Sequence, residues 1–518
     1  MGPTSAAMPT CRGDGPLTNQ VERRVIRKVT VRLVPFLGLL YLINYLDRVN
    51  LGFAALTMNG DLGLSAAAYG LGAGLFFIGY FFFEVPSNII LHRVGARVWI
   101  ARIMVTWGLV ASATAFIHGE ISFYVVRVLL GVAEAGFFPG IILYLTYWFP
   151  RAQRAKIVAL FFLAVPLSSV IGSPLSTLLI QNGAGVLGFD AGWRFMFFVE
   201  GVPGVLLGVL VLAFLPSRPR DGKWLTEQES SALEGRIAEE DSRDVGAEVL
   251  TRAALMHPRV IALSVVYFGI VYGLYVLAFF LPQVIKGLQK QFQVTFSLVE
   301  IGLITAVPYA VASVAMVLWA RHSDRTGEGA GHVAIAAFVG AVAIAAALYM
   351  NTPLLVMTCI TVCAMGVYAA IPVFWQLPNA FLIGVDAAVG IGLINSFGNL
   401  SGFLGPYLTG WLQGLTGSFR PGLWVVAGFM VLAGGIALSL RAGDTAARKT
   451  GCRRRRGRRE GMPPLTLGAH CVGGRTWTRR CSPAPAGRAA LASLGDHRAV
   501  CLPGNGELGR GARPCTAA

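Results

Sequence analysis

Residues 33–57 read LVPFLGLLYLINYLDRVNLGFAALT, an apolar run that contains one acidic and one basic side chain, Asp47 and Arg48. A helix of about 20 residues crosses the hydrocarbon core of a bilayer, so this run is long enough to span it. In hydrocarbon no water satisfies backbone groups, and the run must therefore be helical. Charges at that depth are costly and indicate a function or a buried partner. The stretch predicts a membrane helix that carries a charged site.

The composition of the whole chain agrees with this interpretation. Of its 518 residues, 55% are hydrophobic and only 13% are charged, whereas soluble domains carry about 25% charged residues. So few charges cannot cover the surface of soluble domains, which excludes a soluble enzyme. Similar apolar runs recur in two groups of six, at 33–57, 67–91, 99–117, 121–148, 157–181 and 194–215, and at 260–284, 299–320, 332–350, 353–382, 387–413 and 421–440.

We therefore predict an all-α membrane protein with twelve transmembrane helices in two six-helix bundles. The expected divisions are a cytoplasmic leader over 1–30, a first bundle over 31–215, a central cytoplasmic loop over 216–258, a second bundle over 259–441 and a basic tail over 442–518. In the central loop, Thr226 and Glu229 have the spacing of a capping box, which predicts a helix there.

The two halves resemble internal repeats. Gly95 and Gly327 lie in corresponding short loops 232 positions apart, and Pro174 and Pro406 lie in corresponding spans at the same separation. Two landmarks at one offset indicate parallel six-helix repeats, which are typical of one transporter architecture.

Basic residues in the short loops predict the orientation, since cytoplasmic loops are enriched in Lys and Arg. They cluster before the first span and in alternate loops, as Arg23, Arg24, Arg27, Lys28, Arg32, Arg93, Arg97, Arg102, Arg151, Arg154, Lys156, Arg321 and Arg325. Both termini and the central loop are therefore expected in the cytoplasm. Lys286 and Lys290 are the exceptions.

The net charge of +17 is concentrated in the tail. From Gly443 to Ala518 the chain has fourteen Arg and one Lys against four acidic residues, which leaves a net +6 for residues 1–442. A stretch rich in Arg, Gly and Pro without periodicity is typical of disorder. The basic residues of the body thus indicate which loops are cytoplasmic, and the rest of the positive charge belongs to the tail. We therefore expect no nucleic-acid partner.

Motifs of enzymes and of metal sites are missing from the sequence. It has no H-E-x-x-H, no G-x-S-x-G and no phosphate-binding Walker loop. We therefore expect no catalytic residue, no metal and no cofactor, and transport driven by a gradient rather than by ATP hydrolysis.

Four charged residues are the main candidates for this chemistry. Asp47 and Glu134 are carboxylates that can take and release protons, while Arg48 and Arg127 can hold an anionic substrate. Arg127 and Glu134 are seven residues apart, about two helical turns, and so lie on one face of their span. The alternative is that the four form ion pairs that only lock the helices together.

The second half offers neutral polar groups instead. Trp375 and Gln376 lie between two prolines in one span, and Asn395 and Asn399 are one turn apart in the next. Amide side chains inside a membrane need hydrogen-bond partners and favour a cavity wall. These groups are candidates for substrate selection, with interhelical hydrogen bonds as the alternative role.

Three motifs carry a family resemblance: residues 44–50 (NYLDRVN), residues 79–88 (GYFFFEVPSN) and residues 131–140 (GVAEAGFFPG), the last preceded by Arg127. Over about residues 20–441 the chain resembles the anion:cation symporter family of the major facilitator superfamily, which includes tartrate, galactonate, phthalate and 4-hydroxyphenylacetate permeases. The resemblance implies proton-coupled uptake of organic anions by alternating access between two six-helix bundles.

The resemblance also implies roles for single residues. By similarity to the family's galactonate transporter, Asp47 and Glu134 match the proton-coupling acids, Arg48 matches the ligand of the substrate carboxylate, and Arg127 matches the arginine that pairs with the acids. Tyr80 and Asn395 fall where that transporter contacts its substrate. The complete expected substrate-binding set is Arg48, Arg127, Tyr45, Tyr80, Trp375, Gln376, Asn395 and Asn399.

From these observations we expect a monomeric symporter in the inner (plasma) membrane. It would import a small hydroxylated or aromatic carboxylate, tartrate-like or sugar-acid-like, together with protons. Two alternatives stay open, namely an uncoupled anion exchanger or facilitator, and a transporter-derived membrane sensor.

Overall fold

The computed structural model describes residues 19–242, 257–379 and 385–460. The chain divides into two units, residues 1–454 and residues 455–518, and the membrane helices belong to the first unit. Of the predicted tail, residues 461–518 lie outside the described part of the chain, as do residues 1–18 of the predicted leader.

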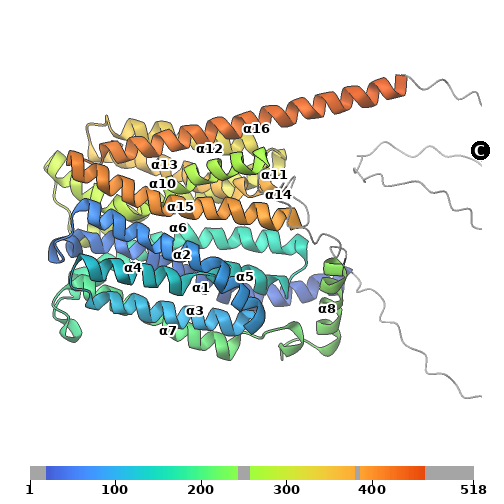
Figure 1. Ribbon diagram of the computed structural model, residues 1–518, viewed down its shortest axis with the longest axis horizontal. Coiled ribbons are helices and arrows are strands. Elements are labelled where there is room, and N and C mark those ends of the chain that lie inside the picture. The colour runs from blue at the N-terminus through green and yellow to red at the C-terminus, as the bar shows by residue number, and fades with distance from the viewer. Residues whose placement is uncertain (1–18, 243–256, 380–384, 461–518) are drawn as a thin grey trace, which may run out of the picture. The chain divides into compact units, whose positions relative to one another are not determined.

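Long helices form the first half of the chain (Figure 1). They are α1 (Asn19–Asp61), α2 (Ala66–Val94), α3 (Ala96–Ala113), α4 (Glu120–Glu134), α5 (Phe137–Thr146), α6 (Arg151–Asn182) and α7 (Gly192–Phe214). The predicted span at 121–148 is therefore not one continuous helix, because the backbone leaves the helical conformation between α4 and α5.

The predicted helix of the central loop is confirmed. α8 (Glu227–Ser242) begins at a capping box in which the backbone N–H of Glu229 donates to the Thr226 hydroxyl at 3.2 Å, and the N–H of Thr226 donates to the Glu229 carboxylate at 3.0 Å. The Lys28 ammonium of α1 forms an ion pair with Glu229 at 2.8 Å. Trp224, just before the helix, stacks on Trp148 with ring centroids 5.6 Å apart. The described part of the linker thus lies against the first half.

The second half repeats the pattern of the first. Its helices are α10 (Pro258–Phe292), α11 (Leu298–Thr326), α12 (Ala330–Ala347), α13 (Pro353–Phe374), the short α14 (Gln376–Asn379), α15 (Val385–Thr416) and α16 (Arg420–Glu460). The predicted span at 353–382 ends early as a continuous helix, at Phe374, and α14 follows after a break at Trp375.

Eleven segments of the described chain are long and apolar enough to cross a membrane. The twelfth predicted span corresponds to α15, whose glycines and asparagines make it less apolar, but which is 32 residues long and packs against α2 and α10. With α15 added to these eleven segments of the described chain, six spans precede α8 and six follow it, so the predicted class of twelve membrane helices in two bundles is confirmed.

The internal repeat is visible in how the helices begin and end. Gly95 and Gly327 follow α2 and α11 with φ angles of 94° and 64°, a region that favours glycine because it has no Cβ. Ser65 and Ser297, again 232 positions apart, cap the starts of the same two helices through their side chains. Equivalent helices therefore start and stop on equivalent residues.

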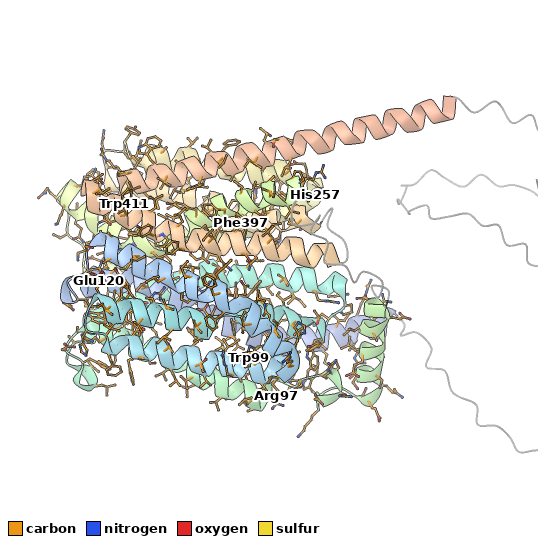
Figure 2. All side chains as sticks on the ribbon, in the orientation of Figure 1. Arg97, Trp99, Glu120, His257, Phe397 and Trp411 are labelled. Atoms are coloured by element: carbon orange, nitrogen blue, oxygen red, sulfur yellow. The ribbon has the colours of Figure 1, made fainter. Side chains whose placement is uncertain are left out.

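The bundle has two ends, marked by labelled residues in Figure 2. Glu120 and Trp411 lie at the end where α1 stops and α2 starts, which we call the α1–α2 end. Arg97 and His257 lie at the opposite end, where α2 stops and α3 starts, which we call the α2–α3 end. The α8 helix lies at the α2–α3 end as well.

The two halves approach each other most closely at the α1–α2 end. α15 of the second half lies beside α2 of the first (Figure 1), and a Cβ at Gly70 would collide with the Pro406 carbonyl oxygen. A Cβ at Gly302 of α11 would lie 2.6 Å from the Ser173 carbonyl oxygen of α6. Small residues thus permit direct backbone contact between the halves at this end.

Candidate functional site

The centre of the site is a buried ion pair between the first and fourth spans. Arg48 of α1 donates from Nε to Oε1 of Glu134 at 2.7 Å, and its Nη2 bonds to the same oxygen. Three aromatic rings surround the guanidinium, with centroids 5.0 Å (Tyr45), 5.2 Å (Phe76) and 5.4 Å (Tyr80) from its central carbon. Ring faces attract a cation, so they help to hold Arg48 in this position.

Glu134 occupies the last position of α4 because the chain breaks there. Ala135 has an extended ψ of 131° and Gly136 a positive φ of 85°. The Ser87 hydroxyl donates to the Ala135 carbonyl at 2.7 Å, and a Cβ at residue 136 would collide with that hydroxyl. The break therefore needs a glycine, and it directs the end of α4 toward α1.

Asp47 is buried next to Arg48 in the sequence but has a different set of partners. Its two oxygens accept hydrogen bonds from Asn50 Nδ2 and Trp107 Nε1, each at 2.8 Å. Both are neutral donors. Asp47 therefore lies within the first half, and it is not among the residues that line the cavity described below.

Arg127 is also buried, and its guanidinium lies against α2. Its Nε and Nη2 donate to the carbonyls of Gly72 and Ala73, both at 3.4 Å, and the guanidinium lies over the Phe76 ring at 5.0 Å. Arg127 does not line the cavity, in contrast to its expected place among the substrate ligands. Arg127 and Glu134 are both buried, as a shared face of α4 predicts. The two side chains contact different helices, however: Arg127 contacts α2, and Glu134 contacts α1.

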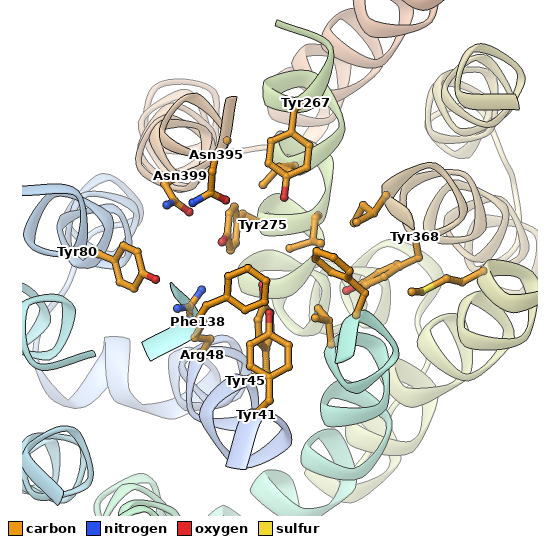
Figure 3. Close-up of a pocket in the computed structure, with 17 residues that line it drawn as sticks. Tyr41, Tyr45, Arg48, Tyr80, Phe138, Tyr267, Tyr275, Tyr368, Asn395 and Asn399 are labelled. Carbon is orange, nitrogen blue, oxygen red and sulfur yellow. The ribbon is translucent and has the colours of Figure 1, made fainter. Parts of the chain in front are cut away.

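A cavity lies beside Arg48, between the two halves (Figure 3). Its walls include the expected residues Tyr45, Tyr80, Asn395 and Asn399 together with Arg48. The structure therefore brings these five predicted residues together around one cavity.

Tyrosines dominate the remaining wall, and they come from both halves. The cavity is lined by Tyr41, Tyr45, Tyr80, Tyr267, Tyr275 and Tyr368. Four of these tyrosines were not in the expected substrate-binding set, namely Tyr41, Tyr267, Tyr275 and Tyr368. Tyr41 is one turn before Tyr45 on the same face of α1. Phenol rings provide apolar surface and a hydroxyl that can donate or accept a hydrogen bond.

The carboxamides of the second half bond to an acid of the first half. Asn395 Nδ2 donates to Oε1 of Glu84 at 3.3 Å, and Asn399 Nδ2 donates to Oε2 at 3.5 Å. Glu84 lies on α2, one turn after Tyr80. This contact joins the two halves directly beside the cavity.

Two predicted ligands, Trp375 and Gln376, are not in the wall of this cavity. The Trp375 ring packs on Tyr267 with centroids 4.9 Å apart. The Gln376 amide is exposed and donates to Asp324 at 2.8 Å.

Comparison with known proteins gives the family. Residues 37–387 match the family model of the Major Facilitator Superfamily. A protein of Agrobacterium vitis named "Putative tartrate transporter" is 51% identical over 439 residues, which cover 85% of this chain and 96% of that protein. The inner membrane transport protein RhmT of Escherichia coli is 38% identical over 423 residues, covering 82% and 96%.

Solved structures share the fold at low identity. The xylose transporter XylE of E. coli, in a partially occluded inward open conformation, superposes with a TM-score of 0.60 at 16% identity, covering 80% of this chain and 98% of that one. A bacterial homologue of the human lysosomal transporter Spinster, inward-facing and occupied, gives 0.63 at 18% identity, covering 78% and 95%.

The family match, the relatives and the two-bundle fold agree with one another. The chain is a multi-pass membrane protein with a transport function, not an enzyme. It belongs to the Major Facilitator Superfamily.

Proposed function

We propose that this chain is a proton-coupled symporter that imports a small hydroxylated carboxylate across the plasma membrane by alternating access. The observation that carries the proposal is the Arg48–Glu134 pair. The guanidinium lines the cavity between the two halves, and it is bonded to a carboxylate that can take a proton.

The coupling follows from competition for one guanidinium. When a proton binds to Glu134, its carboxylate loses its charge and holds Arg48 less strongly, so Arg48 can bind the substrate carboxylate with its planar fork of N–H donors. When the proton leaves, Glu134 recovers Arg48 and the substrate is released. Proton and anion therefore bind together and leave together.

Asp47 is proposed as the second proton-binding acid. Its present partners, Asn50 and Trp107, are neutral donors, and a buried carboxylate without a bonded cation is costly. Arg127 is close enough to Asp47 for their charges to interact. A proton on Asp47 changes the charge balance around Arg127 and the first half, which favours the loaded carrier's rearrangement.

The direction of transport rests on the basic loops. They place the α2–α3 end in the cytoplasm, and the halves contact each other at the α1–α2 end, which would then face outside. In the alternate state this end opens and the other closes. The glycine-lined contact between α2 and α15 is the surface that separates.

Two features support a hydroxylated carboxylate as the substrate. The cavity offers one guanidinium, two carboxamides and several phenol hydroxyls, which suit a carboxylate that carries hydroxyl groups. The relative from A. vitis bears the name of tartrate. L-tartrate is therefore the first substrate to test, followed by sugar acids and aromatic acids.

Uptake into proteoliposomes tests the proposal. We expect accumulation of radiolabelled L-tartrate, or of another acid of the panel, when the outside is more acidic than the inside. In Glu134→Gln this concentrative uptake should fall by at least tenfold, while exchange of labelled for unlabelled substrate continues, because exchange needs no net proton movement.

Glu120→Gln is the matched control, since Glu120 is a carboxylate on the same helix that is exposed and bonded to Tyr124. Accumulation that ignores the pH gradient, or concentrative uptake that survives in Glu134→Gln, would contradict proton coupling and favour an uncoupled exchanger.

A further inference from the structure

Glu84 is a buried acid that the coupling scheme above does not use. Only 8% of its surface is exposed. Both of its oxygens accept hydrogen bonds from α15, one from Asn395 and one from Asn399. Both oxygens of Glu84 therefore act as hydrogen-bond acceptors in this conformation.

The position of this contact is defined by the α2–α15 interface. From the α1–α2 end inward, Gly70 meets Pro406, Gly74 meets Phe403, and Phe77 meets Gly402. The contact of Glu84 with the two asparagines follows next along α2. It therefore lies where the interface reaches the cavity.

Arg48, Tyr80, Asn395 and Asn399 surround one part of the cavity in Figure 3. A small dicarboxylate bound to Arg48 through one carboxylate would reach this group of donors with the other. The amide N–H groups of Asn395 and Asn399 are the donors that its second carboxylate needs. In this structure both of them donate to Glu84.

The charges around Glu84 are few. Arg48 of α1 is the cation that acts on it, and Arg48 is itself bonded to Glu134 of α4. On the same helix, Tyr80 is the titratable group that interacts with Glu84, and the others are Tyr69, His92 and Arg93. Over residues 390–416 α15 carries no charged side chain, its one charged residue is Asp386, nine positions before Asn395, and α5 carries none.

The arginines of α3, the remaining neighbour of α2, are directed elsewhere. Arg97 donates to the Leu212 carbonyl of α7, and Arg102 lies over the Trp99 ring at 4.2 Å. Within the described residues, Glu84 forms no ion pair. A second carboxylate entering beside it would meet an uncompensated negative charge.

We propose that Glu84 controls whether the carrier accepts a second carboxylate on its substrate, and that it does so by taking one additional proton. This inference rests on the proposed transport of organic anions. Glu84 acts through Asn395 and Asn399 and is thus a positioning residue for the substrate.

The step is balanced in protons and hydrogen bonds. A proton from the medium binds to one oxygen of Glu84, and the hydrogen bonds from Asn395 and Asn399 to this carboxyl group break. Their Nδ2–H groups then donate to the second carboxylate of the substrate. After the substrate leaves, the proton leaves Glu84 and the amides return to it. A monocarboxylate does not need this proton.

A matched pair of substrates tests the proposal: L-tartrate, and L-threonate, in which a hydroxymethyl group replaces one carboxylate of L-tartrate. Both are fully ionised between about pH 6 and pH 8. In the wild-type protein the ratio of KM for L-tartrate to KM for L-threonate should rise as pH rises, by up to about tenfold per pH unit for one linked proton. The pH dependence that comes from protons transported with either substrate affects both KM values equally and cancels in this ratio.

Glu84→Gln removes the charge and keeps the shape. In this variant the KM ratio should become independent of pH and stay at its low-pH value, whereas Glu84→Asp should keep a pH-dependent ratio. Glu120→Gln, with the same change on an exposed carboxyl, should behave as wild type.

Each other outcome has a distinct meaning. A wild-type ratio that does not change with pH overturns the role of Glu84 without any variant, and so does an unchanged pH-dependent ratio in Glu84→Gln. Equal loss of both substrates in Glu84→Gln and Glu84→Asp indicates a purely structural residue. If the wild-type protein transports no organic anion, the proposed function fails and this inference fails with it.

Discussion

At the scale of single residues, the break after Glu134 depends on Gly136. A side chain there would be strained by the positive φ and would collide with the Ser87 hydroxyl. We expect Gly136→Ala to lower stability by about 1–3 kcal/mol, which would appear as a lower midpoint of thermal unfolding in detergent. It should also reduce uptake, because Glu134 would shift relative to Arg48. Gly60→Ala is the control, since a Cβ there meets nothing within 4 Å.

A second change at Ser87 relieves only the closest of these contacts. The double variant Gly136→Ala with Ser87→Ala removes the hydroxyl, but it keeps the positive φ, leaves the Cβ of residue 87 at 2.8 Å, and loses the hydrogen bonds of the hydroxyl with Ala135 and Trp99. It should therefore recover only part of the lost stability. Complete recovery would mean that the backbone conformation at residue 136 contributes nothing.

At the scale of helices, the α2–α15 contact depends on Gly70 and Gly410, whose backbones lie against each other. A valine at residue 70 has no space when the two helices are in contact, so Gly70→Val should favour the state that is open at the α1–α2 end. Spin labels at residues 60 and 416 should then report a longer distance, and uptake should fall at least tenfold. Gly428→Val on α16, where a Cβ meets nothing within 4 Å, should change neither quantity. An unchanged distance in Gly70→Val would show that this interface does not open.

At the scale of the whole molecule, the linker is bonded to the first half through Glu229. The Lys28 ammonium donates a hydrogen bond to Glu229 and the Thr226 N–H donates another, and together they lower the pKa of the Glu229 carboxyl. A lowered pKa means that this contribution is present at neutral pH and is lost only as pH falls through the lowered value. The pair is partly exposed and so contributes at most about 1 kcal/mol.

Hydrogen exchange tests this attachment. Glu229→Gln should increase amide exchange over residues 227–240 at pH 7 by a few-fold and leave the membrane helices unchanged. Glu227→Gln, two residues earlier on the same helix, should have little effect. Equal exchange in Glu229→Gln and wild type would show that the Lys28 contact does not hold the linker.

The sequence by itself determined the number and order of the membrane helices, because the bilayer leaves an apolar run of this length no other structure. It also determined the repeat at 232 positions and the capping box at Thr226, since these depend on local backbone requirements. It identified Arg48, Tyr45, Tyr80, Asn395 and Asn399 as polar groups that belong together. Charged and amide groups in a membrane are rare enough to be recognised without coordinates.

The tertiary structure alone decided which partner each group has. Arg127 and Glu134 share a face of α4, yet one bonds to α2 and the other to α1, because the chain breaks at Gly136. Trp375 packs on Tyr267 and Gln376 bonds to Asp324, so neither lines the cavity. The sequence indicates Glu84 as an acid inside a span, but its partners Asn395 and Asn399 lie on α15, more than 300 residues later in the chain. Local sequence encodes helices, whereas the contacts between helices depend on the packing of both halves at once.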